Sequence, residues 1–410
     1  MMSPILEGIR VIDAATYIAA PSAAAILADF GADVIKIERP PHGDPFRYLH
    51  QVSGMPDCDV AYQWIMDNRN KRSLALDLAR GAGRGVLMRL VERADVFLTN
   101  YQPALIRKFG LGWEELRAVN ARLIYASVTG YGETGADADK PGYDMTAYYA
   151  RSGLMDFIHN AGSDPALSPC GFGDHPTAMS LFGGIMLALY RRLQTGQGGK
   201  VSTTLMANGV WANASLIQGA LCGASFRERR HRRHPHNPLV NHYQARDGRR
   251  FLFCLLDPVK DWARLCRAME REDLIEDTLF ATPAARRENS AELVKLLDAV
   301  FEARDMVDWE ARFAAQDVLY APVAVTRELA DDPALWEQKI IRQFAGGSSR
   351  TIANPIRFDG TESAPPRSAP EIGAHTNEIL AELGYCEEEA AELCGSGIAV
   401  QAGVASKNEA

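Results

Sequence analysis

The chain has 410 residues, of which 47% are hydrophobic and 23% are charged, and its formal net charge at pH 7 is −8. This length and composition predict a globular protein with two domains, or one large α/β domain with an appended lobe. The acidic balance argues against a nucleic-acid-binding protein, because such proteins need a basic surface. Seven cysteines occur without a CxxC pair, so neither a disulfide framework nor a zinc site is indicated.

The N-terminal residues show no targeting signal, because they lack the basic and apolar regions of a signal peptide. No segment has the roughly 18 uninterrupted apolar residues that a membrane-spanning helix requires. We therefore expect a soluble, cytoplasmic protein with reduced thiols that contacts neither a membrane nor nucleic acid.

Short apolar strands alternate with helices through the first half of the chain. Residues 9–13 predict a strand, residues 16–30 a helix that stops at Gly31, and residues 33–38 a second strand. Such a βαβ unit predicts a parallel sheet. The same alternation continues to residue 127, so the best fold is α/β with a doubly wound open sheet. The first strand–helix turn has no G-x-G-x-x-G pattern, which argues against a dinucleotide site.

Polar residues follow several of the expected strands directly. Arg39, Asn100 and residues 129–131 each lie just past a strand end. In an open parallel sheet the carboxyl ends of the strands border the ligand crevice, although each residue is equally compatible with an ordinary loop.

A mostly apolar stretch begins at Asp174, which two glycines (Gly171 and Gly173) precede and Pro176 follows. An aspartate before an apolar helix is typical of an N-cap, with proline in the first turn. The alternative is a carboxylate kept ionised at the positive end of the helix dipole, where the glycines allow a ligand to approach. The two interpretations do not exclude each other.

The composition changes over residues 224–250, which are basic, rich in histidine and interrupted by proline. Residues 258–325 then alternate amphipathic helices with short links, which predicts a smaller lobe. Within the basic segment, residues 227–233 contain five arginines and a histidine. Such a run indicates a solvated face, or else a lid, a dimer contact or a clamp for an anionic ligand. The tail after Gly395 is expected to be frayed.

Four ordered segments (residues 32–39, 70–77, 126–132 and 171–174 with the following helix) resemble the class III coenzyme A-transferases, the formyl-CoA and carnitine CoA-transferase family. Residues 373–380 also fit, and the resemblance extends from about Leu6 to Leu393. It implies a Rossmann-like large domain from residues 1–222 and 329–410, a small α+β domain from residues 223–328, and an interlinked homodimer.

The resemblance implies that Asp174 is the nucleophile. An ionised carboxylate attacks the thioester carbonyl of an acyl-CoA, giving an acyl-aspartyl anhydride and free CoA thiolate. The thiolate then attacks the aspartyl carbonyl, which leaves an enzyme–CoA thioester and releases the first acid. An acceptor carboxylate reverses these steps. Coenzyme A is thus a substrate, and no metal, ATP or permanently bound cofactor is needed.

The resemblance also assigns a set of contacts to CoA, with the last two beside the thioester: Arg39, Leu76, Asp77, Leu78, Ala79, Asn100, Tyr101, Gln102, Lys108, Tyr143 and Asp144. Arg39 and Lys108 offer cationic groups for a CoA phosphate, and the alternative is that each forms a surface salt bridge.

Two departures from the formyl-CoA transferases bear on the substrate. Ile18 stands where those enzymes carry glutamine, and residues 235–241, with Asn237 and Pro238, replace their tetraglycine lid. A pocket formed by these residues and Tyr143 favours a medium-sized organic acid (dicarboxylic, hydroxy or aryl) over formate or oxalate.

Two other functions fit the same fold. An α-methylacyl-CoA racemase would need a His–Asp pair, but the matching position holds Tyr143 and Asp144, and tyrosine is a poor base at neutral pH. His175, next to the nucleophile, is either a substitute base or a structural residue. The remaining alternative is a non-catalytic CoA-binding protein.

Overall fold

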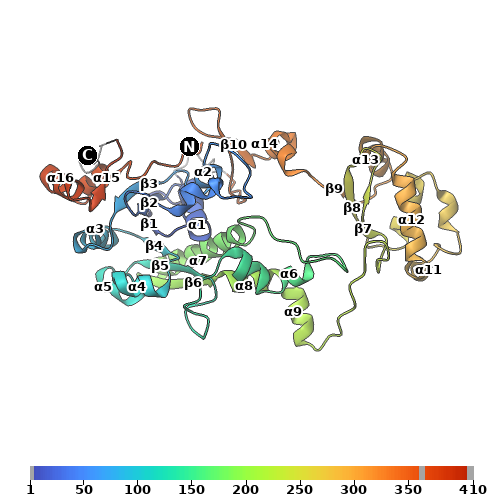
Figure 1. Ribbon diagram of the computed structural model, residues 1–410, viewed down its shortest axis with the longest axis horizontal. Helices are drawn as coiled ribbons and strands as arrows, with labels where there is room; N and C mark the ends of the chain where they lie inside the picture. Colours follow the sequence, from blue (N-terminus) through green and yellow to red (C-terminus); the bar gives the residue numbers. More distant parts are fainter. Residues whose placement is uncertain (1–3, 360–364, 404–410) are drawn as a thin grey trace. The chain divides into compact units, whose positions relative to one another are not determined.

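The computed structural model describes residues 4–359 and 365–403 and contains two compact units. The first unit comprises Met1–Phe157, Leu167–Leu221 and Pro333–Ala410, and the second comprises Ile158–Ala166 and Cys222–Asp332. The first unit therefore contains both the N-terminal half and the C-terminal segment of the chain (Figure 1).

A seven-stranded sheet forms the centre of the first unit, in the order β12-β3-β2-β1-β4-β5-β6. All neighbouring strands are parallel except β12 and β3, which confirms an α/β fold with a mostly parallel sheet. The strand order reverses at β1, which pairs with both β2 and β4, so a topological switch point lies at this strand. The strands are β1 (Arg10–Ala14), β2 (Asp33–Glu38), β3 (Arg72–Leu76), β4 (Val96–Thr99), β5 (Ile124–Thr129), β6 (Gly199–Thr204) and β12 (Ala399–Val400).

Helices cover both faces of this sheet (Figure 1). Successive residues of β1 enter different cores, since Val11 packs with the helices of one face and Ile12 with those of the other. The first face carries α1 (Ala19–Asp29) and α7 (Asp174–Thr195), and the second carries α3 (Gly81–Glu92), α5 (Trp113–Val119), α15 (Thr376–Glu382) and α16 (Glu387–Gly395).

Two of the local expectations above are wrong, and so is the single long helix to about Ala220 that the sequence predicts after the strand at residues 201–205. The first helix begins at Ala19 rather than at residue 16, because Tyr17 has a left-handed φ of 62° that a helix does not allow. The helix after β6 is interrupted at Asn213, giving α8 (Leu205–Ala212) and α9 (Ala214–Leu221). The described tail is not frayed, because β12 pairs antiparallel with β3; the terminal residues 404–410 lie outside the described residues.

Smaller elements complete the first unit. Two of them border the cavities described below: the π-helix η2 borders the candidate site and α2 borders a second cavity. They are η1 (Pro45–Gln51), α2 (Tyr62–Asp67), α4 (Pro103–Phe109), η2 (Asp144–Ala150), α6 (Leu154–Phe157), α14 (Pro333–Glu337), β10 (Ile341–Gln343) and β11 (Arg350–Ile352).

The second unit has its own antiparallel sheet in the order β7-β8-β9 and its own apolar core. Aromatic residues dominate this core: the ring of Phe301 lies 5.0 Å from that of Phe251 and 5.1 Å from that of Trp309. The elements are β7 (Val240–Gln244), β8 (Arg250–Cys254), α10 (Lys260–Ala268), η3 (Glu272–Ile275), α11 (Pro283–Glu288), α12 (Ser290–Phe301), α13 (Met306–Ala315), β9 (Tyr320–Pro322) and η4 (Thr326–Asp331).

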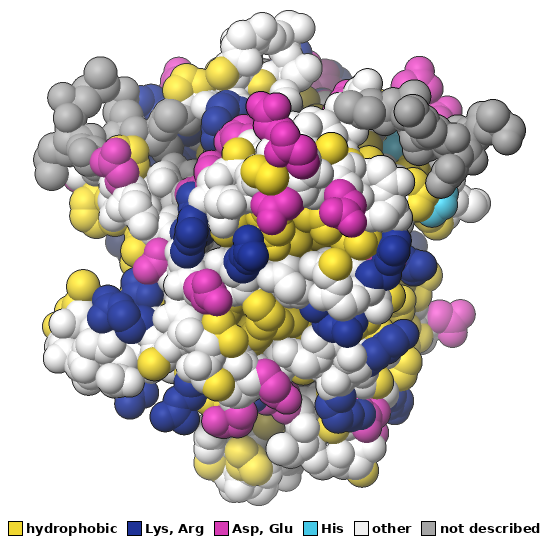
Figure 2. Space-filling model, turned by 90° about the vertical axis from the view of Figure 1, so that its left-hand side faces the viewer, with side chains coloured by type: hydrophobic (Ala, Val, Ile, Leu, Met, Phe, Trp, Pro, Cys, Tyr) yellow, Lys and Arg dark blue, Asp and Glu magenta, His cyan; other side chains and the backbone are white. Residues whose placement is uncertain are grey.

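Charged side chains of both signs are interspersed on the face of the protein shown in Figure 2, with apolar side chains between them. Among the described residues, no helix is both long enough and apolar enough to cross a membrane. The same residues contain no cluster of three or more His, Cys, Asp or Glu side chains that could hold a metal ion.

Candidate functional site

A cavity of about 520 Å³ lies in the first unit at the carboxyl ends of β1, β4 and β5. It therefore lies at the switch point of the sheet, where open α/β sheets bind ligands. Its walls come from the turn after β1, the residues after β4, the end of β5, the loop before η2 and the turn before α7. Seven of the residues expected in the site line it: Ile18, Asn100, Tyr101, Gln102, Tyr143, Asp144 and Asp174.

Asp174 is the first residue of the 22-residue helix α7, and its side chain does not cap the helix. The N-cap residue is Gly173, whose carbonyl oxygen accepts a hydrogen bond from the Thr177 hydroxyl at 2.8 Å. Among the described residues, no group donates a hydrogen bond to the Asp174 carboxylate, which lines the cavity. The carboxylate is therefore available to a ligand, and the N-cap interpretation is wrong.

The two glycines before Asp174 are required by their neighbours. A Cβ atom on Gly173 would lie 2.4 Å from Cγ of Tyr148, so no side chain fits there. Gly171 has a φ of +80°, and a Cβ atom on it would lie 2.8 Å from Cε1 of His175. Both glycines thus let the turn pack tightly against η2 and the first turn of α7.

The electrostatic surroundings of Asp174 favour its protonated form. Burial, followed by the negative charge of Asp144, raises the pKa of Asp174 to about 7, against the opposing charge of His175. The helix N-terminus therefore does not keep the carboxylate fully ionised at neutral pH, contrary to the expectation from the sequence. A carboxyl group with a pKa near 7 is a feature typical of functional sites.

Asp144 is the first residue of the π-helix η2, a geometry often found at functional sites, and Tyr143 is its N-cap residue. The buried Asp144 accepts a hydrogen bond from the Met145 amide at its Oδ1 atom (2.7 Å), whereas its Oδ2 atom has no hydrogen-bond partner among the described residues. Tyr143 is 59% exposed and meets the ring of Tyr17 edge-on at 6.0 Å. No histidine is among the residues that line this cavity, so the His–Asp pair of a racemase is not found there.

The segment after β4 provides another wall. Both ends of the Asn100 side-chain amide bond the backbone of Thr16, in the turn after β1. Tyr101 lies against the apolar core, and burial raises its pKa to about 12, so its phenol stays protonated. Gln102 is exposed at the start of α4.

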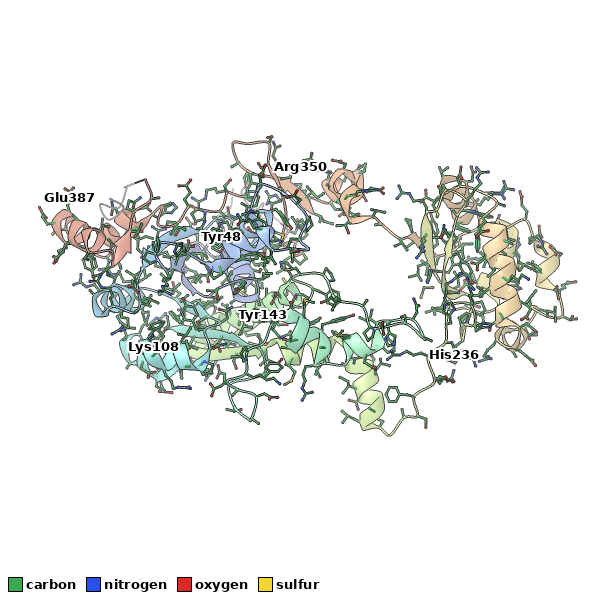
Figure 3. All side chains as sticks on the ribbon, in the orientation of Figure 1. Tyr48, Lys108, Tyr143, His236, Arg350 and Glu387 are labelled. Atoms are coloured by element: carbon green, nitrogen blue, oxygen red, sulfur yellow. The ribbon has the colours of Figure 1, made fainter. Side chains whose placement is uncertain are left out.

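The other residues that the resemblance assigns to CoA do not line this cavity. Arg39 is exposed directly after β2, and Lys108 is exposed on α4 (Figure 3). Neither forms an ion pair within the described part of the chain, which argues against the salt-bridge alternative for both. Leu76 is the last residue of β3, and residues 77–79 follow it. The side chains of Leu76 and Leu78 are buried in the core, and Asp77 Oδ1 accepts a hydrogen bond from the Ala79 amide at 3.0 Å.

Asn237 and Pro238 belong to the second unit, so their place in the substrate pocket stays a prediction. Each supports a local turn, since Asn237 Oδ1 accepts from the Leu239 amide at 3.0 Å and the Pro238 carbonyl accepts from the Tyr243 hydroxyl at 2.7 Å. Within the basic run 227–233, Arg232 forms an ion pair with Asp298 at 2.5 Å. At least this arginine is a structural contact rather than a ligand group.

Tyr17 and Cys170 are among the cavity residues that were missed in the sequence. Tyr17 contributes to the wall because of its left-handed backbone, which no sequence signal predicts. Cys170 also lines the cavity, and burial raises its pKa to about 11, so it is a neutral thiol at physiological pH. The sequence signal that could have identified Cys170 is its position in the Cys-Gly-Phe-Gly-Asp turn that ends at Asp174.

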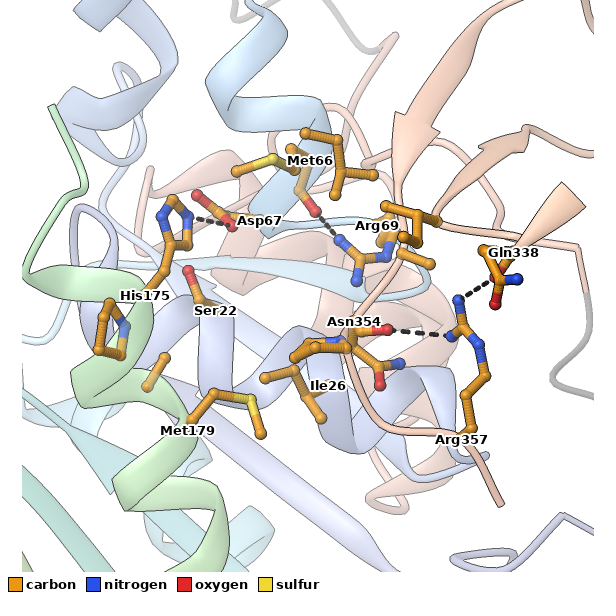
Figure 4. A pocket seen from close by; sticks show the side chains of 16 residues that line it. Ser22, Ile26, Met66, Asp67, Arg69, His175, Met179, Gln338, Asn354 and Arg357 are labelled. Carbon is orange, nitrogen blue, oxygen red and sulfur yellow. Dashed lines mark hydrogen bonds and ion pairs between the residues drawn. The ribbon is translucent and has the colours of Figure 1, made fainter. Parts of the chain in front are cut away.

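A second cavity of about 660 Å³ lies on the other side of the α7 N-terminus and is lined by His175 rather than Asp174 (Figure 4). The Nε2 atom of His175 lies 3.4 Å from Oδ1 of Asp67, at the end of α2. Adjacent residues of one helix thus border two different cavities. Most of the area that lines this second cavity is apolar, with Met179 and Ile352 among its residues.

Comparisons with known proteins agree with the resemblance seen in the sequence. The family model described as CoA-transferase family III matches residues 6–376. The (R)-2-hydroxy-4-methylpentanoate CoA-transferase of Clostridioides difficile is 30% identical over 391 residues, which cover 94% of this chain and 97% of the relative. The cinnamoyl-CoA:phenyllactate CoA-transferase of Clostridium sporogenes is 31% identical over 399 residues, covering 95% and 96%.

A solved structure of a CAIB/BAIF family protein from Brucella suis has the same fold, with a TM-score of 0.83 and 29% identity over 93% of this chain and 100% of that one. The family model covers nearly the whole sequence, and the relatives align over almost their full lengths. This chain belongs to CoA-transferase family III.

Proposed function

We propose that Asp174 is the nucleophile through which this CoA-transferase moves CoA between an acyl-CoA and a free carboxylic acid. The Asp174 carboxylate attacks the thioester carbonyl, the C–S bond breaks, and an aspartyl anhydride and CoA thiolate form. The thiolate attacks the aspartyl carbonyl, which releases the first acid and leaves an aspartyl–CoA thioester. The acceptor acid then reverses both steps, with no net change of protons or redox state.

One observation carries this proposal: Asp174 is among the residues that line the cavity at the switch point, and its carboxylate does not cap its own helix. A capping carboxylate would be held by backbone amides and would be a weaker nucleophile. The raised pKa of about 7 also makes the ionised form more basic than an ordinary aspartate, which favours attack on a carbonyl.

The strand ends support a path for CoA along the carboxyl edge of the sheet. Arg39 and residues 77–79 follow β2 and β3, and Asn100 follows β4. The exposed Arg39 and Lys108 side chains provide unpaired positive charge for phosphate groups among the described residues. Because the side chains of Leu76 and Leu78 are buried, residues 76–79 would contact CoA through their backbone.

The acid is a medium-sized organic acid rather than formate or oxalate. Apolar and aromatic side chains dominate the wall of the cavity, including Tyr17, Ile18, Leu49 and Leu205. Lys140 is the only lysine or arginine among the residues that line it. This wall fits the branched or aryl side chain of a 2-hydroxy acid better than the second carboxylate of a dicarboxylic acid. Two relatives are named for acids of that kind, 2-hydroxy-4-methylpentanoate and phenyllactate.

A mass-spectrometric exchange assay tests this proposal. Wild type would be incubated with acyl-CoA donors (cinnamoyl-CoA, 4-methylpentanoyl-CoA, succinyl-CoA, formyl-CoA) and with 2-hydroxy, aryl and dicarboxylic acids. We expect exchange with branched or aryl 2-hydroxy acids, none in Asp174→Asn, and hydroxylamine modification of Asp174 in wild type with a donor. Turnover by Asp174→Asn, or an unmodified Asp174 peptide during turnover, would overturn the nucleophile.

We also propose the interlinked homodimer that the family resemblance implies. Light scattering after size-exclusion chromatography measures the mass directly, and a monomer of 410 residues at micromolar concentration would contradict the proposal.

A further inference from the structure

His175, the residue after the proposed nucleophile, lies between two hydrogen-bond acceptors. Its Nδ1 atom is 3.1 Å from the carbonyl oxygen of Gly171, and its Nε2 atom is 3.4 Å from Oδ1 of Asp67. A carbonyl oxygen can only accept, so Nδ1 carries a hydrogen in this contact. A carboxylate also only accepts, and a ring that donates to both partners is an imidazolium.

Asp67 is in turn dependent on His175. It is buried, its Oδ2 atom has no hydrogen-bond partner among the described residues, and its Oδ1 atom faces the His175 ring. A buried carboxylate without a counter-ion is strongly unfavourable. The nearby Lys71 ammonium also attracts Asp67 electrostatically, but its hydrogen bonds go to Asp13, to the Pro21 carbonyl and to Asn68.

The backbone is shaped to admit this ring. Gly171 has no side chain, and a Cβ atom there would lie 2.8 Å from Cε1 and 2.9 Å from Nδ1 of His175. Any other residue at this position would push the ring out of its place between Gly171 and Asp67. The Gly171 carbonyl also accepts from the His175 amide at 3.2 Å, so this turn fixes both the backbone and the ring.

We propose that Asp67 holds His175 as an imidazolium, whose charge increases the fraction of the adjacent Asp174 carboxyl group that is ionised for attack on the thioester. His175 is thus a positioning residue, and the proposal rests on Asp174 being the nucleophile. It explains why the histidine faces the second cavity, since its influence on Asp174 is electrostatic and does not require contact with the substrate (Figure 4).

The other ionisable groups near Asp174 make this charge necessary. Burial is the main cause that raises the pKa of Asp174, the charges of Asp144 and Asp67 raise it further, and the charge of His175 lowers it. Cys170 faces the same carboxylates and is a neutral thiol. Although burial disfavours the imidazolium, the hydrogen bond and charge of Asp67 and the charge of Asp174 raise the pKa of His175 above its usual value.

Two measurements test the proposal. ¹⁵N NMR of histidine-labelled enzyme, with the His175 signal assigned from its loss in His175→Gln, reports the charge of the ring without a substrate. We expect an imidazolium at pH 7 in wild type and a neutral ring in Asp67→Asn, with His42→Gln and Asp57→Asn as exposed controls. A neutral ring at pH 7 in wild type would overturn the proposal.

The second measurement is the pH profile of kcat/KM for cinnamoyl-CoA with phenyllactate. Removing the positive charge in His175→Gln should shift the acidic limb of this profile to higher pH by about 0.5–1 pH unit. Activity at pH 6 should then fall about 3–10-fold, with near-complete recovery above pH 8.5. Equal loss at every pH would indicate a merely structural role and would overturn the proposal.

The outcomes also separate this inference from the proposed function. If Asp174→Asn still transfers CoA, the nucleophile is wrong even when the NMR signal of His175 is that of an imidazolium. If hydroxylamine modifies Asp174 but His175→Gln keeps the wild-type pH profile, the nucleophile stands and only the role of His175 is wrong.

Discussion

Asn100 joins two strands of the sheet by making both of its amide hydrogen bonds to Thr16. Its Oδ1 atom accepts from the Thr16 amide at 2.9 Å, and its Nδ2 atom donates to the Thr16 carbonyl at 2.6 Å. Thr16 follows β1 and Asn100 follows β4, the neighbours at which the strand order reverses. The two hydrogen bonds of Asn100 therefore fix this part of the cavity wall without a ligand.

Asn100→Ala should loosen the turn that carries Tyr17 and Ile18 into the cavity. Because both backbone groups of Thr16 lose their partner, we expect a loss of about 1–3 kcal/mol in unfolding free energy. KM for acyl-CoA should rise several-fold. Urea unfolding and steady-state kinetics measure the two effects, with the exposed α7 variant Gln194→Ala as control. Unchanged stability and KM would show that the turn holds its shape without Asn100.

Asp174→Asn should stabilise the protein while abolishing transfer. The pKa of Asp174 is about 7 in the folded protein, compared with 3.8 for an ordinary aspartate, so its ionisation destabilises the fold as pH rises from about 4 to 7. Asparagine removes this cost. With allowance for solvent screening, we expect the unfolding free energy to increase by about 1–2 kcal/mol at pH 8. The gain should vanish near pH 4.

Urea unfolding at pH 4, 6 and 8 measures this dependence, with exposed Asp59→Asn as the control that shows no such trend. A gain in stability that is the same at all three pH values would mean that it does not come from the ionisation of Asp174.

Asp13→Ala should strongly destabilise the first unit. The buried Asp13 lies 2.8 Å from the Lys71 ammonium and 3.7 Å from the Lys36 ammonium. Removing it leaves two buried cations without this carboxylate, which costs about 3–5 kcal/mol. Burial already lowers the pKa of Lys71 to about 8, and the variant should lower it further. Part of the loss should therefore be recovered between pH 7 and pH 9, as Lys71 releases its proton in the folded state.

Denaturant unfolding at both pH values measures the Asp13→Ala loss. Lys71→Met in the same assay separates the contributions of the two lysines to stability, because Asp13 still has Lys36 as a partner in this variant. A variant with wild-type stability at pH 7 would contradict the buried ion-pair assignment.

Phe301→Ala should unfold the second unit. Phe301 is fully buried and contacts Tyr243, Phe251 and Trp309 in the aromatic core. Truncation of a buried phenylalanine costs about 3–5 kcal/mol, because it removes apolar contacts and leaves a cavity. Limited proteolysis should cleave within residues 222–332 first, and near-UV circular dichroism should weaken. The exposed Val307→Ala should behave as wild type.

Local sequence patterns predicted most of the sheet and its helices. Short apolar runs identified β1 and β2, and the residues around Asp174 predicted the start of a helix. These features depend on neighbours within a few residues, so the sequence contains their cause. The antiparallel pairing of β12 with β3 was missed because two residues near the end of the chain carry no periodic signal.

The sequence by itself determined the family, the mostly parallel sheet and the choice of Asp174 as the candidate nucleophile. Only the tertiary structure decided that the Asp174 carboxylate is free of capping bonds and that Asn100 is committed to Thr16. It also brought Asp67 to His175 across 108 positions of the chain. Hydrogen-bond partners and pKa values depend on groups that approach only when the chain folds, and residue spacing does not reveal them.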